Sequence, residues 1–419
     1  MYQIYTGISV LLCVFFYWYY IQDLQKYKGL RLSLWYMIIN NIPIFISLIW
    51  LESGVYVVEQ DAHSYLNGAS VYFLLYNVVF YFGTKLGYLL TSGIARTVTT
   101  KRDITPNEKK YTLQLLLFSI ISLFINYLLS PKPFFTDGIT RFNYWENSAI
   151  PILSAIFGNV SAFIAIGLGC IFWIGKSQSA LKLFIVYIIY LILIGHKFGA
   201  PLMGIVLFTL PRIVGEQSLI SFVKKYLPKI IAVGSIIGIV VYYHYFVANP
   251  YSYADLGVGE ALAQRAFVLQ GHVFWGSVKY ESILADKWEF DDLFNGMRTM
   301  MVLLSPASTY IIDESYFSGH SFTAAYPAIL NVLTSIPVGL VLNGLVGIPH
   351  GVLIFLCAKN LFTGRVLLTM FSIQLLLWFE YMFTMAKFNY LINPFFWVVA
   401  IIVFIGSYIR FSWNHKREQ

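Results

Sequence analysis

The first apolar segment of the chain, YQIYTGISVLLCVFFYWYYI at residues 2–21, contains no charged side chain. An α-helix rises about 1.5 Å per residue, so a segment of this length would cross the hydrocarbon core of a bilayer, which is about 30 Å thick. The segment lacks a small-residue cleavage site, and no basic flank precedes it. We therefore predict a retained membrane helix rather than a signal peptide.

The whole chain shares this apolar character. Of its 419 residues, 58% are hydrophobic and only 11% are charged, and the mean hydropathy is +0.69. Soluble globular domains have a much lower apolar content, and the strands of membrane β-barrels are only about 10 residues long. The composition therefore predicts an all-α polytopic membrane protein. Cys13, Cys170 and Cys357 lie in three separate apolar runs, which suits small hydrophobic residues better than a disulfide framework.

Further apolar runs predict about eleven transmembrane helices in one membrane domain, residues 1–419. The sixth and seventh are short for a full crossing, so they could form a bent or re-entrant pair. The predicted helices cover residues 2–21, 32–51, 69–92, 111–129, 150–174, 180–195, 199–214, 230–247, 337–357, 366–384 and 394–411.

The distribution of charge predicts the orientation. Most of the 28 Lys and Arg residues lie in the loops of one side, so the positive-inside rule places the amino terminus outside and the carboxyl terminus in the cytoplasm. The net charge of +8 is then a topology signal rather than a sign of nucleic-acid binding. Lys85, inside the third span, is expected to snorkel toward the cytoplasm. The longest outer segment, residues 248–336, is expected to form a cap with amphipathic helices, where we expect the function to lie.

The stretch QRAFVLQGHVFWGS, residues 264–277, carries the first candidate site in this cap. We predict a helix over residues 261–275, on which Arg265 and His272 lie on one face roughly 10 Å apart. A guanidinium suits phosphate oxygens and an imidazole can exchange a proton near neutral pH, while Gln270 and Trp275 could contact a sugar. The alternative is an interfacial helix whose arginine meets lipid headgroups and whose histidine caps a neighbour.

Two shorter outer stretches are also polar. GHKFGAP, residues 195–201, places His196 and Lys197 at the turn between the two short helices, either as a ligand site or as a turn with a snorkelling lysine.

In TRFNYWEN, residues 140–147, Arg141 precedes three side chains that suit the apolar faces and hydroxyls of sugars: Tyr144, Trp145 and Glu146. Aromatic residues also form the interfacial belt of membrane proteins, which is the alternative.

The last polar groups lie nearer the carboxyl terminus. SGHSFTAAYPAI, residues 318–329, contains His320, and Arg298 lies upstream of it. Glu380 lies within the tenth predicted span, near its outer end. A carboxylate in lipid costs about 2–3 kcal/mol unless it faces a cavity, so Glu380 is a site candidate by its position alone.

These segments bring a set of cations to one side of the membrane, as an anionic, lipid-attached headgroup requires. The set comprises Arg141, Lys197, Arg265 and Arg298. The chain contains no P-loop, zinc-ligand spacing or GxSxG elbow. Asp291 and Asp292 could suggest a metal-dependent transferase, but no further ligands accompany them. We therefore expect neither a metal nor a cofactor.

The stretches RFNYWEN, GHKFGAPLMGIVLF, QRAFVLQGHVFWGS and SGHSFTAAYPAIL follow one another among about eleven helices and two prominent outer loops. In this order they resemble the bacterial O-antigen polymerases, the Wzy family, over most of the chain. The resemblance implies a GT-C-like fold in the bacterial inner membrane, with the active site facing the periplasm. It also implies a metal-independent glycosyltransferase.

The reaction implied by the resemblance joins two oligosaccharides that are linked to undecaprenyl diphosphate. The growing chain is transferred to a new lipid-linked repeat unit, and undecaprenyl diphosphate is released. The partners would be these lipid-linked oligosaccharides, membrane lipids and a chain-length-regulating co-polymerase, with no nucleic acid.

The resemblance also assigns roles to the polar groups. Arg265, assisted by the other three cations, would neutralise the leaving diphosphate. His272 would be the general base. The alternatives for the base are His196, His320, Glu146 and Glu380.

Other functions share some of these features. An O-antigen ligase would use the same donor with a lipid A core acceptor, and another glycan-lipid transferase would fit the same layout. A repeat-unit flippase belongs to a different class of protein. Flippases have more spans arranged in two related halves, whereas this chain shows no halves and its polar residues collect at one face.

Overall fold

The computed structural model describes most of the membrane part of the chain. It covers residues 2–57, 62–64, 68–94, 103–133, 135–136, 139, 143–153, 161–196, 199–226, 270–279, 325–385 and 388–408, with six isolated positions, 228, 235, 239, 267, 290 and 294. This part is almost entirely helical, apart from a hairpin whose two strands have two residues each.

The first half of the chain contains, in order, α1 (Tyr2–Lys26), the 3-10 helix η1 (Lys28–Ser33), the π-helix η2 (Trp35–Asn40), α2 (Asn41–Glu52), β1 (Tyr56–Val57), β2 (Ala62–His63), α3 (Ala69–Ile94), α4 (Pro106–Leu129), α6 (Ser161–Trp173), α7 (Gln178–Leu193) and α8 (Gly199–Gly215). The second half contains α11 (His272–Lys279), α16 (Ala325–Leu333), α17 (Ile336–Phe362), α18 (Val366–Met385), η8 (Phe388–Leu391) and α19 (Pro394–Tyr408).

Six helical segments of the described chain are long and apolar enough to cross a membrane. They are Tyr5–Lys26, Lys28–Glu52, Ala69–Gly93, Pro106–Leu129, Ile336–Phe362 and Val366–Thr384. Each coincides with a predicted span, so the all-α membrane architecture is confirmed.

Four further predicted spans are shorter apolar helices, α6, α7, α8 and α19. The sixth and seventh spans were expected to be short, and α7 and α8 have 16 and 17 residues. The span predicted at 230–247 lies almost wholly outside the described residues, so the total of eleven stays a prediction.

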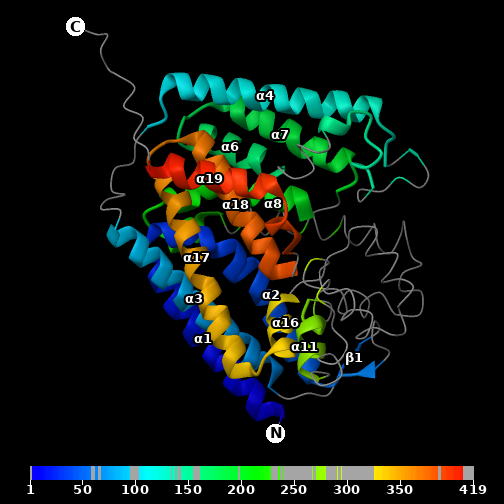
Figure 1. The fold of residues 1–419 in the computed structure, drawn as a ribbon, viewed down its shortest axis with the longest axis vertical. Coiled ribbons are helices and arrows are strands. Elements are labelled where there is room, and N and C mark those ends of the chain that lie inside the picture. The colour runs from blue at the N-terminus through cyan, green and yellow to red at the C-terminus, as the bar shows by residue number, and fades with distance from the viewer. Residues whose placement is uncertain are drawn as a thin grey trace.

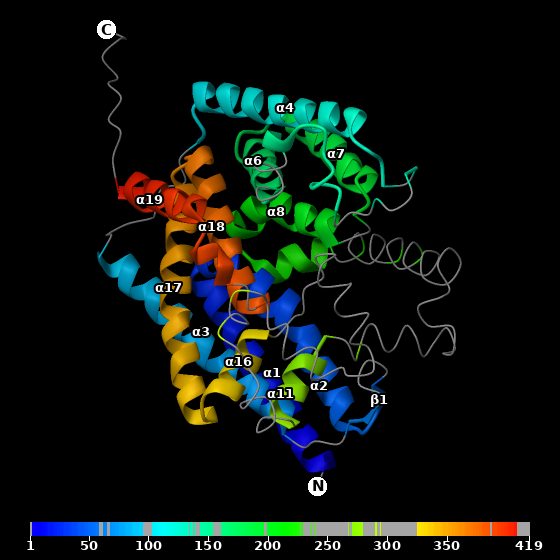
Figure 2. The ribbon, with the colours of Figure 1, turned by 45° about the vertical axis from the view of Figure 1, so that its right-hand side comes forward.

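The helices form two groups that α18 connects (Figure 1). In one group α1, α2, α3 and α17 pack together, with the short helices α11 and α16 at one end. In the other group α4, α6, α7 and α8 pack together. Figure 2 shows the same division from a second direction. Because α18 contacts α17 on one side and α6 on the other, a residue on α18 lies at the junction of the two groups.

The closest helix contact joins α3 and α17 through glycines. Gly83 and Gly87 on α3 face Gly344, Gly347 and Gly351 on α17. A methyl group added to Gly83 would overlap the carbonyl oxygen of Gly344, and one added to Gly351 would overlap backbone atoms of α3. Small residues at such spacing allow membrane helices to approach closely. We call this contact the glycine seam.

Capping interactions gather one set of helix ends. Thr105 caps α4, where its hydroxyl accepts a hydrogen bond from the N–H of Glu108 at 3.3 Å. The Glu108 carboxylate accepts in turn from the N–H of Val366, the first residue of α18, at 2.6 Å. The Lys109 ammonium donates to the carbonyl of Gly175, just after α6, at 2.6 Å. The start of α4, the end of α6 and the start of α18 therefore lie on one side.

The other set of ends is tied together in the same way. Glu52, the last residue of α2, accepts hydrogen bonds from the N–H and the hydroxyl of Ser70, at the start of α3. Ser47 accepts from the N–H of Gly271, which immediately precedes α11. The end of α2, the start of α3 and the start of α11 therefore lie close together.

Lys85 forms an ion pair with a neighbouring helix, in contrast to the snorkelling toward the cytoplasm that was expected. Its ammonium lies 2.7 Å from the Asp23 carboxylate on α1, which also accepts a hydrogen bond from the Tyr81 hydroxyl at 2.7 Å. The same ammonium contacts the hydroxyl of Tyr19 at 2.5 Å. A carboxylate on a neighbouring helix offers more stabilisation than distant water, so Lys85 holds α1 against α3.

Candidate functional site

A buried acid–imidazole pair lies where α17 meets α18. The Nε2 atom of His350 is 3.1 Å from the Oε1 atom of Glu380, and the two side chains are 0% and 2% exposed. Such a pair is rare inside a membrane bundle because ionisable groups are costly there unless they are partnered. Glu380 was predicted as a site residue from its place in the tenth span, and the structure supplies its partner.

A third helix completes this group. The hydroxyl of Thr84, on α3, lies 3.0 Å from the Nδ1 atom of His350. Thr84 follows Gly83 and lies within the glycine seam, so the close approach of α3 and α17 brings the hydroxyl within reach of the ring. Both ring nitrogens therefore have a partner, which holds the imidazole in one orientation. We call these three residues the Thr84–His350–Glu380 group.

Aromatic rings enclose the imidazole. The ring centroid of Phe80 lies 5.0 Å from that of His350, and the centroid of Tyr36 lies 5.7 Å away. Phe379 stacks on the other side at 5.9 Å with an interplanar angle of 16°. Tyr36 belongs to the π-helix η2, a type of segment that is frequent at functional sites. The rings exclude water from the pair.

This environment determines what the pair can do chemically. An apolar surrounding disfavours a net charge, whereas an imidazole with a carboxylic acid, or an imidazolium with a carboxylate, is neutral overall. Both neutral forms hold a proton between Nε2 of His350 and Oε1 of Glu380. The pair can therefore store or transfer a proton, and it also joins α17 to α18.

A chain of hydrogen bonds attaches the short helices α11 and α16 to one end of the bundle. Asn331 on α16 accepts from the Tyr76 hydroxyl of α3 at 2.9 Å and donates to the Ser277 hydroxyl of α11 at 3.2 Å. Ser277 donates in turn to the Phe274 carbonyl at 2.7 Å. Because α16 also contacts α18, these short helices lie next to the helix that carries Glu380.

The predicted helix over residues 261–275 is wrong as one continuous element, and residues 261–266, 268 and 269 lie outside the described residues. The structure has a turn at Gln270 and Gly271, and α11 begins at His272. At this turn the Gly271 N–H donates to the Ser47 hydroxyl at 2.9 Å. His272 is 4% exposed and Trp275 is fully buried, so α11 directs these side chains into the packing against the bundle.

The other described candidates lie where α4 and α7 end. Tyr144 is 1% exposed beside Tyr190 of α7, Trp145 is partly buried, and Glu146 is exposed. Burial raises the pKa of the Tyr144 phenol, which stays neutral at physiological pH. His196 is partly buried after Gly195, whose φ of +88° ends α7. These residues stay predicted site residues, and the Tyr144 ring lies inside the packing rather than at the surface.

Five predicted site residues lie outside the described residues. They are Arg141, Lys197, Arg265, Arg298 and His320. All four cations expected to hold a diphosphate are among them, so that grouping stays a prediction. Among the residues that the structure does describe, no three His, Cys, Asp or Glu side chains gather as a metal site would need.

His350 is the functional candidate that sequence reasoning missed. A histidine in the middle of an apolar helix of 27 residues carries the same signal that identified Glu380, because both are ionisable groups placed in lipid. Thr84 carries no such signal, since threonine is common in membrane helices and commonly bonds to its own backbone.

Comparison with known proteins adds one match. A family model, described as a family of unknown function (DUF6418), matches residues 291–400. This range includes both His350 and Glu380. No curated protein matches the chain, and no solved structure matches it.

Proposed function

We propose that this protein is a membrane-embedded glycosyltransferase of the O-antigen polymerase type. It joins oligosaccharide repeat units linked to undecaprenyl diphosphate on the periplasmic face of the bacterial inner membrane. The amino terminus lies in the periplasm and the carboxyl terminus in the cytoplasm, in keeping with the charge of the loops.

The observation that carries the proposal is the buried His350–Glu380 pair below the docked cap helices. Transfer of a glycan to a sugar hydroxyl forms a C–O bond at the anomeric carbon, breaks the bond to the diphosphate oxygen and releases a proton from the hydroxyl. A proton acceptor is therefore required near the outer side. His272 at the start of α11 is one candidate acceptor, and the His350–Glu380 pair, deeper in the bundle, can take up the proton from it or from the hydroxyl.

The leaving diphosphate needs positive charge rather than a metal. In this proposal Arg265, with Arg141, Lys197 and Arg298, neutralises it on the periplasmic side. The exposed Glu146 and the partly buried Trp145 then contact the glycan.

Reconstitution provides the test. Purified protein is mixed with lipid-linked repeat units, and the products are separated on a ladder gel. We expect the wild type to lengthen the glycan in EDTA, Glu380→Gln to abolish lengthening, and His350→Gln to shift the pH profile of the residual activity. Restoration of activity by Mg²⁺ after EDTA treatment would contradict the metal-independent mechanism.

Glu52→Gln is the matched control for Glu380→Gln. Glu52 is also a buried carboxyl group in the outer half, but it is hydrogen-bonded to Ser70 between α2 and α3. We expect it to reduce stability while each folded molecule keeps its turnover. If Glu380→Gln and His350→Gln both lengthen glycans as the wild type does, the pair has no role in the mechanism.

A proton-coupled transporter of lipid-linked glycans is the second candidate. The observation in its favour is the depth of the His350–Glu380 pair, since carboxylate–histidine chains also form proton relays in transporters. The two functions differ in one respect that can be measured. A polymerase lengthens glycans in detergent without any gradient, whereas a transporter leaves their length unchanged.

A further inference from the structure

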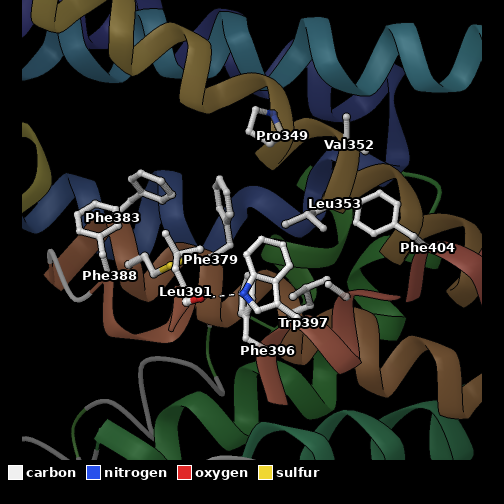
Figure 3. A pocket seen from close by; sticks show the side chains of 13 residues that line it. Pro349, Val352, Leu353, Phe379, Phe383, Phe388, Leu391, Phe396, Trp397 and Phe404 are labelled. Atoms are coloured by element: carbon white, nitrogen blue, oxygen red, sulfur yellow. Dashed lines mark hydrogen bonds between the residues drawn. The ribbon is translucent and has the colours of Figure 1, made fainter. Parts of the chain in front are cut away.

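An apolar groove lies between α17, α18 and α19, beside the Thr84–His350–Glu380 group (Figure 3). Its volume is about 340 Å³, and every side chain that lines it is aliphatic, aromatic or a thioether. Trp397 lies at its rim, 52% exposed, and the indole N–H donates to the Leu391 carbonyl at 2.8 Å (Figure 3). Because apolar contact is non-directional, this lining does not select one apolar ligand over another. A buried polar cluster is more selective, since each of its atoms needs a matching donor or acceptor.

Such a cluster lies where α4 and α7 end, next to the loop at residues 143–150. Asn126 on α4, Tyr144 in the loop and Tyr190 on α7 are 0%, 1% and 1% exposed. The Tyr144 hydroxyl lies close to the side chains of Tyr190, Ser130 and Asn126. The polar ends of three separate segments therefore converge inside the protein.

Two residues of α4 and its cap already hold the loop. The Oδ1 atom of Asn126 accepts from the Ile150 N–H at 3.1 Å and from the Ser130 hydroxyl at 3.4 Å. The Ser130 hydroxyl accepts in turn from the Ala149 N–H at 2.8 Å. Both lone pairs of the Asn126 amide oxygen are thus in use, and its NH₂ group still needs an acceptor.

Three polar atoms of the cluster form no hydrogen bond of acceptable geometry with any residue that the structure describes. They are Nδ2 of Asn126 and the Oη atoms of Tyr144 and Tyr190. Buried polar atoms without a partner are rare in folded proteins, because an unmet hydrogen bond is costly. The two phenols are neighbours, yet their hydroxyls do not satisfy each other. The cluster therefore needs one more polar group.

A water molecule matches this set of atoms. The Asn126 NH₂ group only donates, whereas each phenol can donate or accept. One water can accept from the amide and from one phenol and donate to the other phenol. It then makes about three hydrogen bonds, as buried waters typically do. Side chains this deeply buried leave no route for a larger ligand while the loop is in place.

We propose that one water molecule is bound between Asn126, Tyr144 and Tyr190. This water holds the loop in the position that presents Trp145 and Glu146 to the glycan. The water site stands independently, whereas its role in glycan binding rests on the proposed function. Trp145 packs edge-on against Tyr144, with ring centroids 5.2 Å apart, and Glu146 is exposed. Tyr144 and Tyr190 are therefore positioning residues.

X-ray radiolysis of the wild-type protein tests the water site without any turnover. A bound water yields hydroxyl radicals that oxidise the side chains in contact with it, even buried ones. We expect Tyr144 and Tyr190 to be oxidised faster than Tyr20, which is equally buried but has its hydroxyl 2.8 Å from Ser33.

Two outcomes of radiolysis would overturn the water site. One is oxidation of Tyr144 and Tyr190 no faster than that of Tyr20. The other is oxidation that stops when lipid-linked repeat units are added, because a glycan hydroxyl would then displace the water.

The variant Tyr190→Phe tests how the water acts on the loop. The Tyr190 hydroxyl makes no hydrogen bond to the loop itself, and phenylalanine keeps the ring, so any change in the loop must pass through the cluster. We expect amide exchange at Ala149 and Ile150 to become about three- to tenfold faster, as the loss of one hydrogen bond predicts.

Tyr187→Phe is the matched control. Tyr187 is a buried tyrosine one turn earlier on α7, and its hydroxyl is not among the three atoms without a hydrogen bond. Amide exchange in the loop should match the wild type in this variant. Unchanged exchange in Tyr190→Phe, or an equal change in both variants, would overturn the role of the water in holding the loop.

The ladder assay separates this proposal from the proposed function. A looser loop lowers the fraction of molecules that are ready to bind, which raises KM and leaves kcat unchanged. We expect Tyr190→Phe to raise KM for the lipid-linked repeat unit about three- to tenfold, and Tyr187→Phe to keep the wild-type KM. A fall in kcat at unchanged KM would overturn the positioning role. Selective oxidation of Tyr144 and Tyr190 in a wild-type protein that polymerises no donor would refute the proposed function and support the water site.

Discussion

The substitution Gly347→Ala tests whether the glycine seam determines the geometry of the site. A Cβ atom on Gly347 would lie 2.9 Å from the backbone nitrogen of Thr84 and 3.1 Å from the carbonyl carbon of Gly83, and it would overlap the carbonyl oxygen of Phe80. Ordinary contact begins near 3.4 Å. Since these are backbone atoms of α3, none can rotate away, and the two helices must separate.

The size of the effect follows from this separation. Moving α3 and α17 apart by about 0.5–1 Å forfeits a quarter to a half of the dispersion attraction across the seam. Overpacking of this kind costs about 1–3 kcal/mol, and the rigid backbone on the far side favours the upper end. The same movement lengthens the 3.0 Å contact between Thr84 and His350, so turnover should fall along with stability.

The assay is thermal unfolding of the purified protein in detergent, alongside the ladder assay. Gly93→Ala is the control because Gly93 lies on α3 with no atom within 4 Å of the added methyl group. We expect it to be neutral or slightly stabilising, since alanine favours helices over glycine. If Gly347→Ala and Gly93→Ala have the same midpoint of thermal unfolding, the contact between α3 and α17 is not as close as described, and the predicted loss of stability is refuted.

Three further substitutions test other contacts. Arg31→Lys should lower the free energy of unfolding by about 2–3 kcal/mol, because the fully buried guanidinium donates to carbonyls at the end of α8 that one ammonium cannot all reach. Limited proteolysis should then cleave the chain after α8 faster than in the wild type, and wild-type resistance would contradict this prediction. The single variant Asp23→Asn should unfold at a lower temperature than the double variant Asp23→Asn, Lys85→Met, because the single variant leaves a partly buried ammonium without its carboxylate. The opposite order of unfolding temperatures would show that the ion pair does not stabilise the fold. Asn331→Leu should lower the free energy of unfolding by about 1–3 kcal/mol, because it removes the hydrogen-bond partner of Ser277. Amide hydrogen exchange in α11 should become faster. Unchanged exchange would mean that other contacts hold α11.

The apolar runs were enough to locate the six membrane-length helices of the described chain. Hydropathy over about 20 residues is a local property, and the segments near residues 2–21 and 366–384 needed no neighbour to be recognised. Glu380 was recognised for the same reason, since a carboxyl group in an apolar run is costly wherever the run packs. The shortness of α7 and α8 was also visible in the sequence.

The partners of these residues depended on packing. Thr84 and His350 are 266 residues apart in the chain, and they meet because glycines on α3 and α17 allow the two backbones to touch. Nothing local predicts which faces meet. The same holds for the start of α11 at His272, where Ser47 of another helix accepts the Gly271 N–H.

Aromatic residues show most clearly what the sequence pattern does not predict. Tyr144 and Trp275 were predicted to contact a sugar, yet both rings are buried, whereas Trp397 lies at the rim of a groove that no pattern indicated. Composition does not distinguish an aromatic ring in the core from one at the lipid boundary or one that contacts a ligand. The sequence by itself determined the membrane helices and a carboxyl group that lipid cannot tolerate alone. Only the tertiary structure decided its imidazole partner and the apolar groove beside it, because both are made by side chains from helices that come together solely through packing.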